Sequence, residues 1–210
     1  MDNISLKTIL RLFPYISNKK RASCLKIDDD SLHYISLREV ANKITIIISH
    51  HLKKLGLNKN IIITDATAGV GGNTISFGMK FDYVNAIEID EQRYEYLVNN
   101  ISVYNLTNII TFNSDCLDII TRLKHDVIFI DPPWGGKDYK QYQKLRISLS
   151  NKPIESICNE IITTKIHKPP KLIVLKLPTN YDIEYIFKII KSDTIYLHKL
   201  KKMLIIVIVT

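Results

Sequence analysis

The sequence has few of the residues that build a crosslinked or metal-bound scaffold. Only three cysteines occur among its 210 residues, Cys24, Cys116 and Cys158, and no two of them form a CxxC pair. Isolated cysteines, odd in number, indicate neither a disulfide framework nor a zinc site, and free thiols fit a reducing compartment. We therefore expect an intracellular protein, cytoplasmic or nuclear, without a bound metal.

Long hydrophobic runs are also missing. The start, MDNISLK, lacks the basic region and apolar stretch of a signal peptide. The longest apolar run, 203–209, is too short to span a bilayer, so we expect no membrane partner. The net charge of +8 suits a polyanionic partner such as RNA. A lysine-rich solvated surface explains the same charge, so both interpretations stay open.

From residue 61 onward, strand-like and helix-like segments alternate. Strands are expected at 61–63, 83–87, 109–112, 127–130 and 172–175, and helices at 71–79, 91–104, 116–123, 154–166 and 183–190. Segments 194–197 and 203–209 have no helix between them, which predicts an antiparallel hairpin. The pattern predicts an α/β fold with a mostly parallel, seven-stranded sheet that ends in this hairpin.

The N-terminal part follows a different pattern. Residues 1–35 are expected to form a short extension, with one helix that Pro14 ends. Ser36 stands three residues before Glu39, the spacing of a capping box, and Gly56 is the expected C-terminal cap of the helix that follows. We therefore divide the chain into an extension, 1–35, and a main domain, 36–210.

Three polar segments follow the first three expected strands. The first, 64–73, reads TDATAGVGGN, and its glycines allow a tight turn and a close approach to a ligand. Glu88 ends the second strand, where an acid can bind ribose hydroxyls, whereas Asp90 fits a helix N-cap. Asp115 follows the third strand, and either ligand binding or helix capping explains it.

The fourth expected strand ends in the most informative segment. Asp131, Pro132, Pro133 and Trp134 are followed by Gly135 and Gly136. Ligands bind at the carboxyl ends of strands in open α/β sheets, and two prolines stiffen the turn. Trp134 is the only tryptophan, and its place between prolines and glycines favours a surface for stacking a base over a core anchor.

The segment DPPWGGKDY, 131–139, resembles the (S/D)PPWGG-x-(D/E)Y motif of trimethylguanosine synthases, which methylate guanine N2 of the RNA cap. Further matching segments are DATAGVGGNTISF at 65–77, AIEID at 86–90, VNNISVYN at 98–105 and LPTNYD at 177–182. The resemblance implies the class I, Rossmann-like methyltransferase fold, the cofactor S-adenosylmethionine (AdoMet) and capped RNA as the partner.

The resemblance also implies a role for each site residue. Asp131, Pro132 and Trp134 would be catalytic, and Asp131 would also contact the cofactor. The other implied cofactor contacts are Asp65, Thr67, Ala68, Gly69, Gly71, Asn73, Thr74, Glu88, Ile89, Asp115 and Cys116. The implied substrate contacts are Trp134, Pro133, Asn180, Lys137, Tyr34 and Arg11.

Two departures from the family pattern bear on the substrate. Family members often have Ser where Asp131 stands, and the family's LPRN reads LPTN at 177–180, so an arginine is missing there. An adenine-N6 or ribosomal guanine-N2 methyltransferase is the alternative enzyme. An inactive, RNA-binding methyltransferase-like subunit is the alternative without catalysis.

Overall fold

The computed structural model describes residues 4–164 and 169–210, and the chain divides into two compact units, Met1–Cys116 and Leu117–Thr210. The first unit contributes strands in the order β3-β2-β1, and the second contributes β4-β7-β9-β8, to a sheet of seven strands. The predicted fold class is confirmed by these strands and their pairing. The division at residue 35 stays a prediction.

In the first unit, three parallel strands alternate with helices. The strands are β1 (Ile62–Asp65), β2 (Tyr83–Glu88) and β3 (Ile109–Asn113). Helices α5 (Gly72–Gly78) and α6 (Glu91–Val103) follow the first two strands, and α7 (Cys116–Ile119) begins at the last residue of this unit. The β1 and β2 side chains are mostly buried, whereas β3 lies at an edge and is partly exposed. Parallel pairing places the carboxyl ends of all three strands at one edge of the unit.

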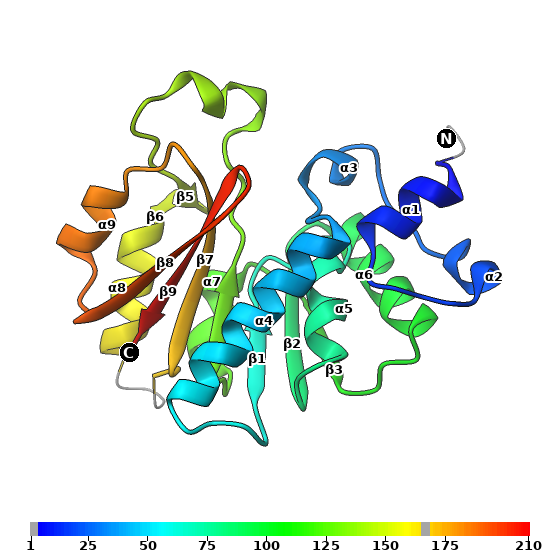
Figure 1. Ribbon diagram of the computed structural model, residues 1–210, viewed down its shortest axis with the longest axis horizontal. Helices are drawn as coiled ribbons and strands as arrows, with labels where there is room; N and C mark the ends of the chain where they lie inside the picture. Colours follow the sequence, from blue (N-terminus) through cyan, green and yellow to red (C-terminus); the bar gives the residue numbers. More distant parts are fainter. Residues whose placement is uncertain (1–3, 165–168) are drawn as a thin grey trace. The chain divides into compact units, whose positions relative to one another are not determined.

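Three short helices and one long helix precede β1. They are α1 (Leu6–Leu12), α2 (Lys19–Ala22), α3 (Ser31–Tyr34) and α4 (Arg38–Lys54) (Figure 1). Phe13 is fully buried in the same core cluster as Val70 and Leu97. The amide of Asn100 on α6 donates to the carbonyls of Lys26 and Val70, at 2.7 and 2.8 Å. The N-terminal helices therefore share one core with the glycine-rich loop.

The expected capping box at Ser36 is wrong. Helix α4 begins at Arg38 with Leu37 as its N-cap, and no side chain caps it. Ser36 is buried instead, and its hydroxyl accepts a hydrogen bond from the Asn73 side-chain amide at 3.2 Å. The Ser36 hydroxyl, which a capping box would have bonded to the helix backbone, is bonded to Asn73 instead. At the other end, Gly56 follows the C-cap Leu55 with φ +73, the left-handed conformation that suits glycine there.

The second unit pairs parallel strands with an antiparallel hairpin. Strand β4 (Val127–Ile130) runs parallel to β7 (Leu172–Pro178), which pairs antiparallel with β9 (Met203–Val209), and β8 (Thr194–Leu200) completes the hairpin (Figure 1). Two more helices, α8 (Ile154–Thr163) and α9 (Ile183–Ile189), belong to this unit, as do the 3-10 segments η1 (Ile120–Arg122) and η2 (Gly136–Gln141). A small hairpin of β5 (Ser148–Leu149) and β6 (Lys152–Pro153) was not expected.

Candidate functional site

In the first unit, the loop after β1 is fixed by Asp65. This side chain is buried, and its carboxylate accepts hydrogen bonds from the Thr74 hydroxyl at 2.6 Å and from the Thr67 backbone N–H at 3.4 Å. Gly69 and Gly71 have φ values of +54 and +100, which side chains other than glycine rarely adopt. One buried acid therefore holds both ends of a loop whose shape depends on glycine.

Glu88, at the end of β2, joins the loop to the next helix. It is buried, and its two carboxylate oxygens accept the backbone N–H groups of Gly69 at 2.7 Å and of Asp90 at 2.9 Å. Each carboxylate oxygen has a second lone pair, so these bonds leave capacity for hydroxyl donors. Asp90 is the N-cap of α6, because its side chain accepts from the Arg93 N–H at 2.9 Å. The expected N-cap role of Asp90 is thus confirmed, whereas the binding of ribose hydroxyls by Glu88 stays a prediction.

The first unit has the features that a nucleoside-containing cofactor needs. A Cβ on Gly69 would meet no atom within 4 Å, so the loop is open on that side. The Asn73 side-chain oxygen is buried and has no hydrogen-bond partner among the described residues, which makes it an acceptor for a ligand N–H or O–H. Ile89 is 64% exposed next to Glu88, an apolar surface suited to a flat base. These residues fit AdoMet.

The other residues predicted to bind the cofactor lie at the same strand edge. Thr67 is partly buried and Ala68 is buried in the loop, with the Ala68 N–H donating to the Ile87 carbonyl at 2.9 Å. Asp115 is partly buried directly before α7, and Cys116 is buried as the first residue of that helix. The predicted cofactor set of the first unit therefore follows the ends of β1, β2 and β3.

The two N-terminal substrate candidates are solvent-exposed. Tyr34, on α3, is 57% exposed, and Arg11 is exposed in the last turn of α1. Neighbouring Ile35 packs closely on the glycine-rich loop, because a Cβ on Gly72 would lie 2.8 Å from the Ile35 side chain. The loop thus positions the segment that carries Tyr34, and the roles of Tyr34 and Arg11 stay predictions.

In the second unit, Asp131 follows β4 and forms a largely buried ion pair. Its carboxylate lies 2.6 Å from the ammonium of Lys176 on β7, and the two side chains are 15% and 5% exposed. Burial raises the pKa of Asp131 above its usual value, and the charge and hydrogen bond of Lys176 oppose that rise. Pro132 is buried and Pro133 exposed, so the chain leaves the sheet within this turn.

Trp134 is partly buried, which is consistent with the expected base-stacking surface rather than a core anchor. Its indole N–H donates to the Lys176 carbonyl at 3.3 Å, and its ring meets the Tyr139 ring edge-on at 5.3 Å between centroids. The ring is therefore held in a defined orientation while part of it remains accessible.

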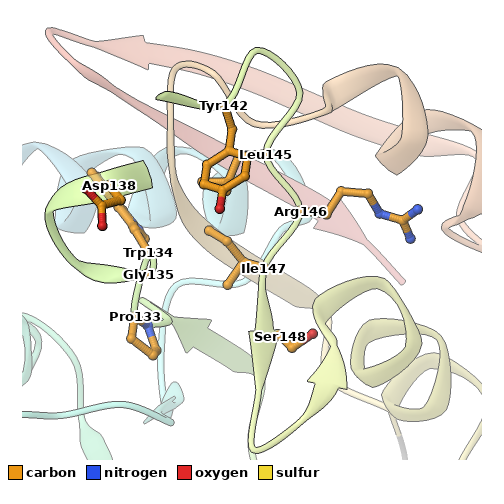
Figure 2. Close-up of a pocket in the computed structure, with 9 residues that line it drawn as sticks. All are labelled: Pro133, Trp134, Gly135, Asp138, Tyr142, Leu145, Arg146, Ile147 and Ser148. Atoms are coloured by element: carbon orange, nitrogen blue, oxygen red, sulfur yellow. The ribbon is translucent and has the colours of Figure 1, made fainter. Parts of the chain in front are cut away.

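Trp134 lines a cavity of about 510 Å³ in the second unit (Figure 2). The cavity is lined by Pro133, Trp134, Gly135, Asp138, Tyr142, Leu145, Arg146, Ile147 and Ser148. A volume of several hundred Å³ suits a nucleobase with part of its sugar. The Arg146 guanidinium stacks on the Tyr185 ring, 3.4 Å from its centroid, which leaves its N–H groups for acceptors such as phosphate.

Two other predicted substrate residues stand nearby in the chain. The Asn180 amide donates to the Tyr139 and Tyr142 carbonyls at 2.7 and 2.8 Å, so it braces the loop after Trp134. Lys137 belongs to η2, and its side chain lies outside the described part of the structure. Sequence reasoning missed Lys176, although a single lysine in the apolar strand 172–178 was a visible signal.

Within 4–164 and 169–210, no three His, Cys, Asp or Glu side chains gather in a way that could hold a metal ion. Over the same residues, every helix is too short or too polar to cross a lipid bilayer.

Proteins with a similar sequence include one from a giant virus and one from yeast. The chain is 38% identical to "Uncharacterized protein L320" of Acanthamoeba polyphaga mimivirus, over 97% of this chain and 86% of that protein. It is 25% identical to the trimethylguanosine synthase of Saccharomyces cerevisiae, over 82% of this chain and 56% of the yeast protein. The match to the yeast enzyme thus leaves almost half of its length uncovered.

Solved structures with a similar fold include two methyltransferases. The T. thermophilus 16S rRNA N2 G1207 methyltransferase (RsmC), in complex with AdoMet and guanosine, has a TM-score of 0.59 at 15% identity, over 88% of this chain and 44% of that one. SMU.1697c of Streptococcus mutans, a putative methyltransferase in complex with SAH, has a TM-score of 0.53 at 16% identity, over 79% of this chain and 98% of that one. At these identities the likeness concerns the fold.

A family model supplies the remaining comparison. The model described as RNA cap guanine-N2 methyltransferase matches residues 60–207, a range that contains both the glycine-rich loop of the first unit and the Asp131–Trp134 turn of the second. With this match over more than half of its length, the chain belongs to the RNA cap guanine-N2 methyltransferase family.

Proposed function

We propose that the protein transfers a methyl group from AdoMet to the exocyclic N2 of 7-methylguanosine in an RNA cap. AdoMet, the expected cofactor, agrees with the family and with solved methyltransferases of this fold that hold AdoMet or SAH. When bound, it supplies an electrophilic methyl group. The observation that carries the proposal is the partly exposed indole of Trp134, which lies beside a cavity of about 510 Å³ and stands three residues after Asp131.

The first unit would bind the cofactor through its strand ends. Glu88 would accept the ribose hydroxyls, because its carboxylate is fixed by two backbone N–H groups and retains lone pairs. The buried Asn73 oxygen would accept a hydrogen bond from the ligand. Ile89 and the segment at Asp115 and Cys116 would contact the adenine, an assignment carried by the family resemblance.

The second unit would bind and align the guanine. Stacking on Trp134 favours 7-methylguanine, because its positive charge adds cation–π attraction to the indole face. The N2 amine is a poor nucleophile, since its lone pair is delocalised into the ring, so alignment supplies much of the rate. Asp131 would accept a hydrogen bond from that amine and stabilise charge that develops on nitrogen. Lys137, Arg11 or Tyr34 would contact the rest of the cap.

The test is mass spectrometry of m7GTP and m7GpppA after incubation with the protein and AdoMet. We expect one or two added methyl groups on the 7-methylated guanine, and far less on GTP. Equal methylation of GTP and m7GTP would contradict the stacking argument. Transfer to uncapped ribosomal RNA or to adenine, with none to m7GTP, would support the alternative enzymes. AdoMet binding without any transfer would point to an inactive RNA-binding subunit.

A further inference from the structure

Lys176 is a buried lysine in the second unit. It lies between Leu175 and Leu177 on β7, a strand whose residues are all buried, and its side chain is 5% exposed. Moving an ammonium out of water is unfavourable unless an anion compensates it closely. Asp131 provides that anion at 2.6 Å. The lysine therefore does not act as a solubilising surface residue.

The same residue also holds Trp134. The Lys176 carbonyl accepts the indole N–H at 3.3 Å, and the Lys176 ammonium lies 5.3 Å from the centroid of the indole ring. One residue thus contacts the carboxylate with its side chain and the indole with its backbone and its charge. Asp131 and Trp134, the two residues proposed to bind the guanine, therefore both contact Lys176.

From this geometry we infer that Lys176 is a positioning residue, which keeps the Asp131 carboxylate ionised and directed beside the Trp134 ring. The inference deepens the proposed function and rests on it for its catalytic meaning. In the reaction, the guanine amine gives its lone pair to the methyl carbon, the carbon–sulfur bond breaks with its electron pair going to sulfur, and the amine releases one proton. An ionised carboxylate can accept the amine's hydrogen bond, take up the released proton and pass it to water, whereas a protonated carboxyl group keeps acceptor oxygens but can take up no proton.

Electrostatics supports the assignment. Burial raises the pKa of Asp131 above its usual value, and among the described residues the Lys176 ammonium opposes that rise through its charge and its hydrogen bond. Of the ionisable side chains on neighbouring η2 that the structure describes, Asp138 and Lys140 are exposed, and Tyr139 meets Trp134 edge-on. Without Lys176, Asp131 would therefore stay protonated to a higher pH. A carboxylate closely paired with a cation typically has its pKa lowered by about 1–3 units.

The single tryptophan allows a test that needs no catalysis. The fluorescence of Trp134, the only tryptophan in the chain, is titrated against pH in the wild type, Lys176→Met and Asp131→Asn. We expect an inflection in the wild type that moves up by about 1–3 pH units in Lys176→Met and disappears in Asp131→Asn. Lys176→Arg, which keeps the charge, should titrate like the wild type, and so should Lys188→Met, which removes an exposed lysine on α9.

Lys176→Gln serves as the second neutral variant if Lys176→Met does not fold, because it retains a hydrogen-bond donor without the charge. An unchanged midpoint in the folded neutral variants, or an inflection that persists in Asp131→Asn, would overturn the inference.

In the methylation assay, the acid limb of kcat against pH should move with the fluorescence midpoint. A loss of kcat that is equal at every pH would make Lys176 merely structural. A protein that methylates no cap would refute the proposed function and leave the fluorescence test of the pair intact.

Discussion

The two units use acidic residues in different ways. In the first, Asp65 and Glu88 are buried against neutral donors, namely a hydroxyl and backbone N–H groups. In the second, Asp131 is buried against a full positive charge, the Lys176 ammonium. Neutral donors fix a carboxylate in a rigid loop, which suits a cofactor that binds in one pose. A charged partner favours the ionised carboxylate, which would suit the proposed contact of Asp131 with a proton-releasing amine.

Asp131→Ala has the largest expected effect, because it removes the ion-paired carboxylate that distinguishes the second unit. We expect kcat for m7GTP to fall by about 10²–10³-fold, the typical loss when one polar group aimed at a transition state is removed. AdoMet affinity, measured by calorimetry, should stay near the wild-type value, because the predicted cofactor contacts of the first unit are untouched and only the predicted contact of Asp131 is lost. Asp193→Ala, an exposed acid of the second unit, is the matched control. Near-normal turnover in Asp131→Ala would remove this residue from the mechanism.

Glu88→Ala tests whether the buried acid at the end of β2 in the first unit binds AdoMet. Hydrogen bonds to a charged group are each worth ~1.5–3 kcal/mol, so we expect AdoMet to bind about 10–100-fold more weakly. The Michaelis constant for m7GTP should change much less. Titration calorimetry with AdoMet and steady-state kinetics with m7GTP measure the two effects separately. If Asp90→Ala instead loses the cofactor while Glu88→Ala retains it, the ribose acid has been assigned two residues too early.

Trp134→Ala tests whether the second unit recognises the methylated base. Loss of one base–aromatic stack costs ~1–3 kcal/mol, so the Michaelis constant for m7GTP should rise by about 5–150-fold while AdoMet affinity is kept. Trp134→Phe should retain part of the activity, although it loses the hydrogen bond to the Lys176 carbonyl. The ratio of m7GTP to GTP methylation is the sharper measurement. If that ratio is unchanged in Trp134→Ala, a residue other than Trp134 recognises the N7 methyl group.

Asp90→Ala has the smallest expected effect. It removes the N-cap of α6, which is worth about 1 kcal/mol and lowers Tm by about 2–4 °C in a chain of this size. AdoMet affinity should be almost unchanged, in contrast to Glu88→Ala. Asp30→Ala is the matched control, because Asp30 is the N-cap residue of α3 without a capping hydrogen bond, and its ion pair with Arg93, at 3.8 Å, is solvent-exposed and contributes little. Equal melting temperatures for the two variants would show that the α6 cap contributes nothing measurable.

Local patterns predicted the regular elements well, because strand and helix periodicities depend on neighbours in the sequence. Strand β4 is found at the predicted residues, and α6 and α9 end one residue earlier than predicted. Strand β7 is longer than predicted, since it continues through Lys176 to Pro178. Lysine disfavours a buried strand on its own, and only the ion pair with Asp131 makes its burial possible.

Side-chain partners were harder to predict, because they come from distant segments. Ser36 has the spacing of a capping box, yet it bonds Asn73, which lies 37 residues away. Asn180 was expected at the substrate, whereas the structure shows it bonded to two carbonyls of the loop after Trp134. Its contact with substrate stays a prediction. In both cases a polar group satisfies its hydrogen bonds with whatever backbone or side chain the fold brings near.

The sequence by itself determined the α/β fold class, the strand-end positions of the candidate residues and, through its motifs, the family. These follow from periodicity, turn residues and short contiguous segments, all of which are local. The tertiary structure alone decided that Lys176 pairs with Asp131, that Glu88 fixes the glycine-rich loop and that the Asn73 side-chain oxygen finds no partner among the described residues. Burial sets the energy of a charge or a hydrogen bond, and burial is a property of the folded chain.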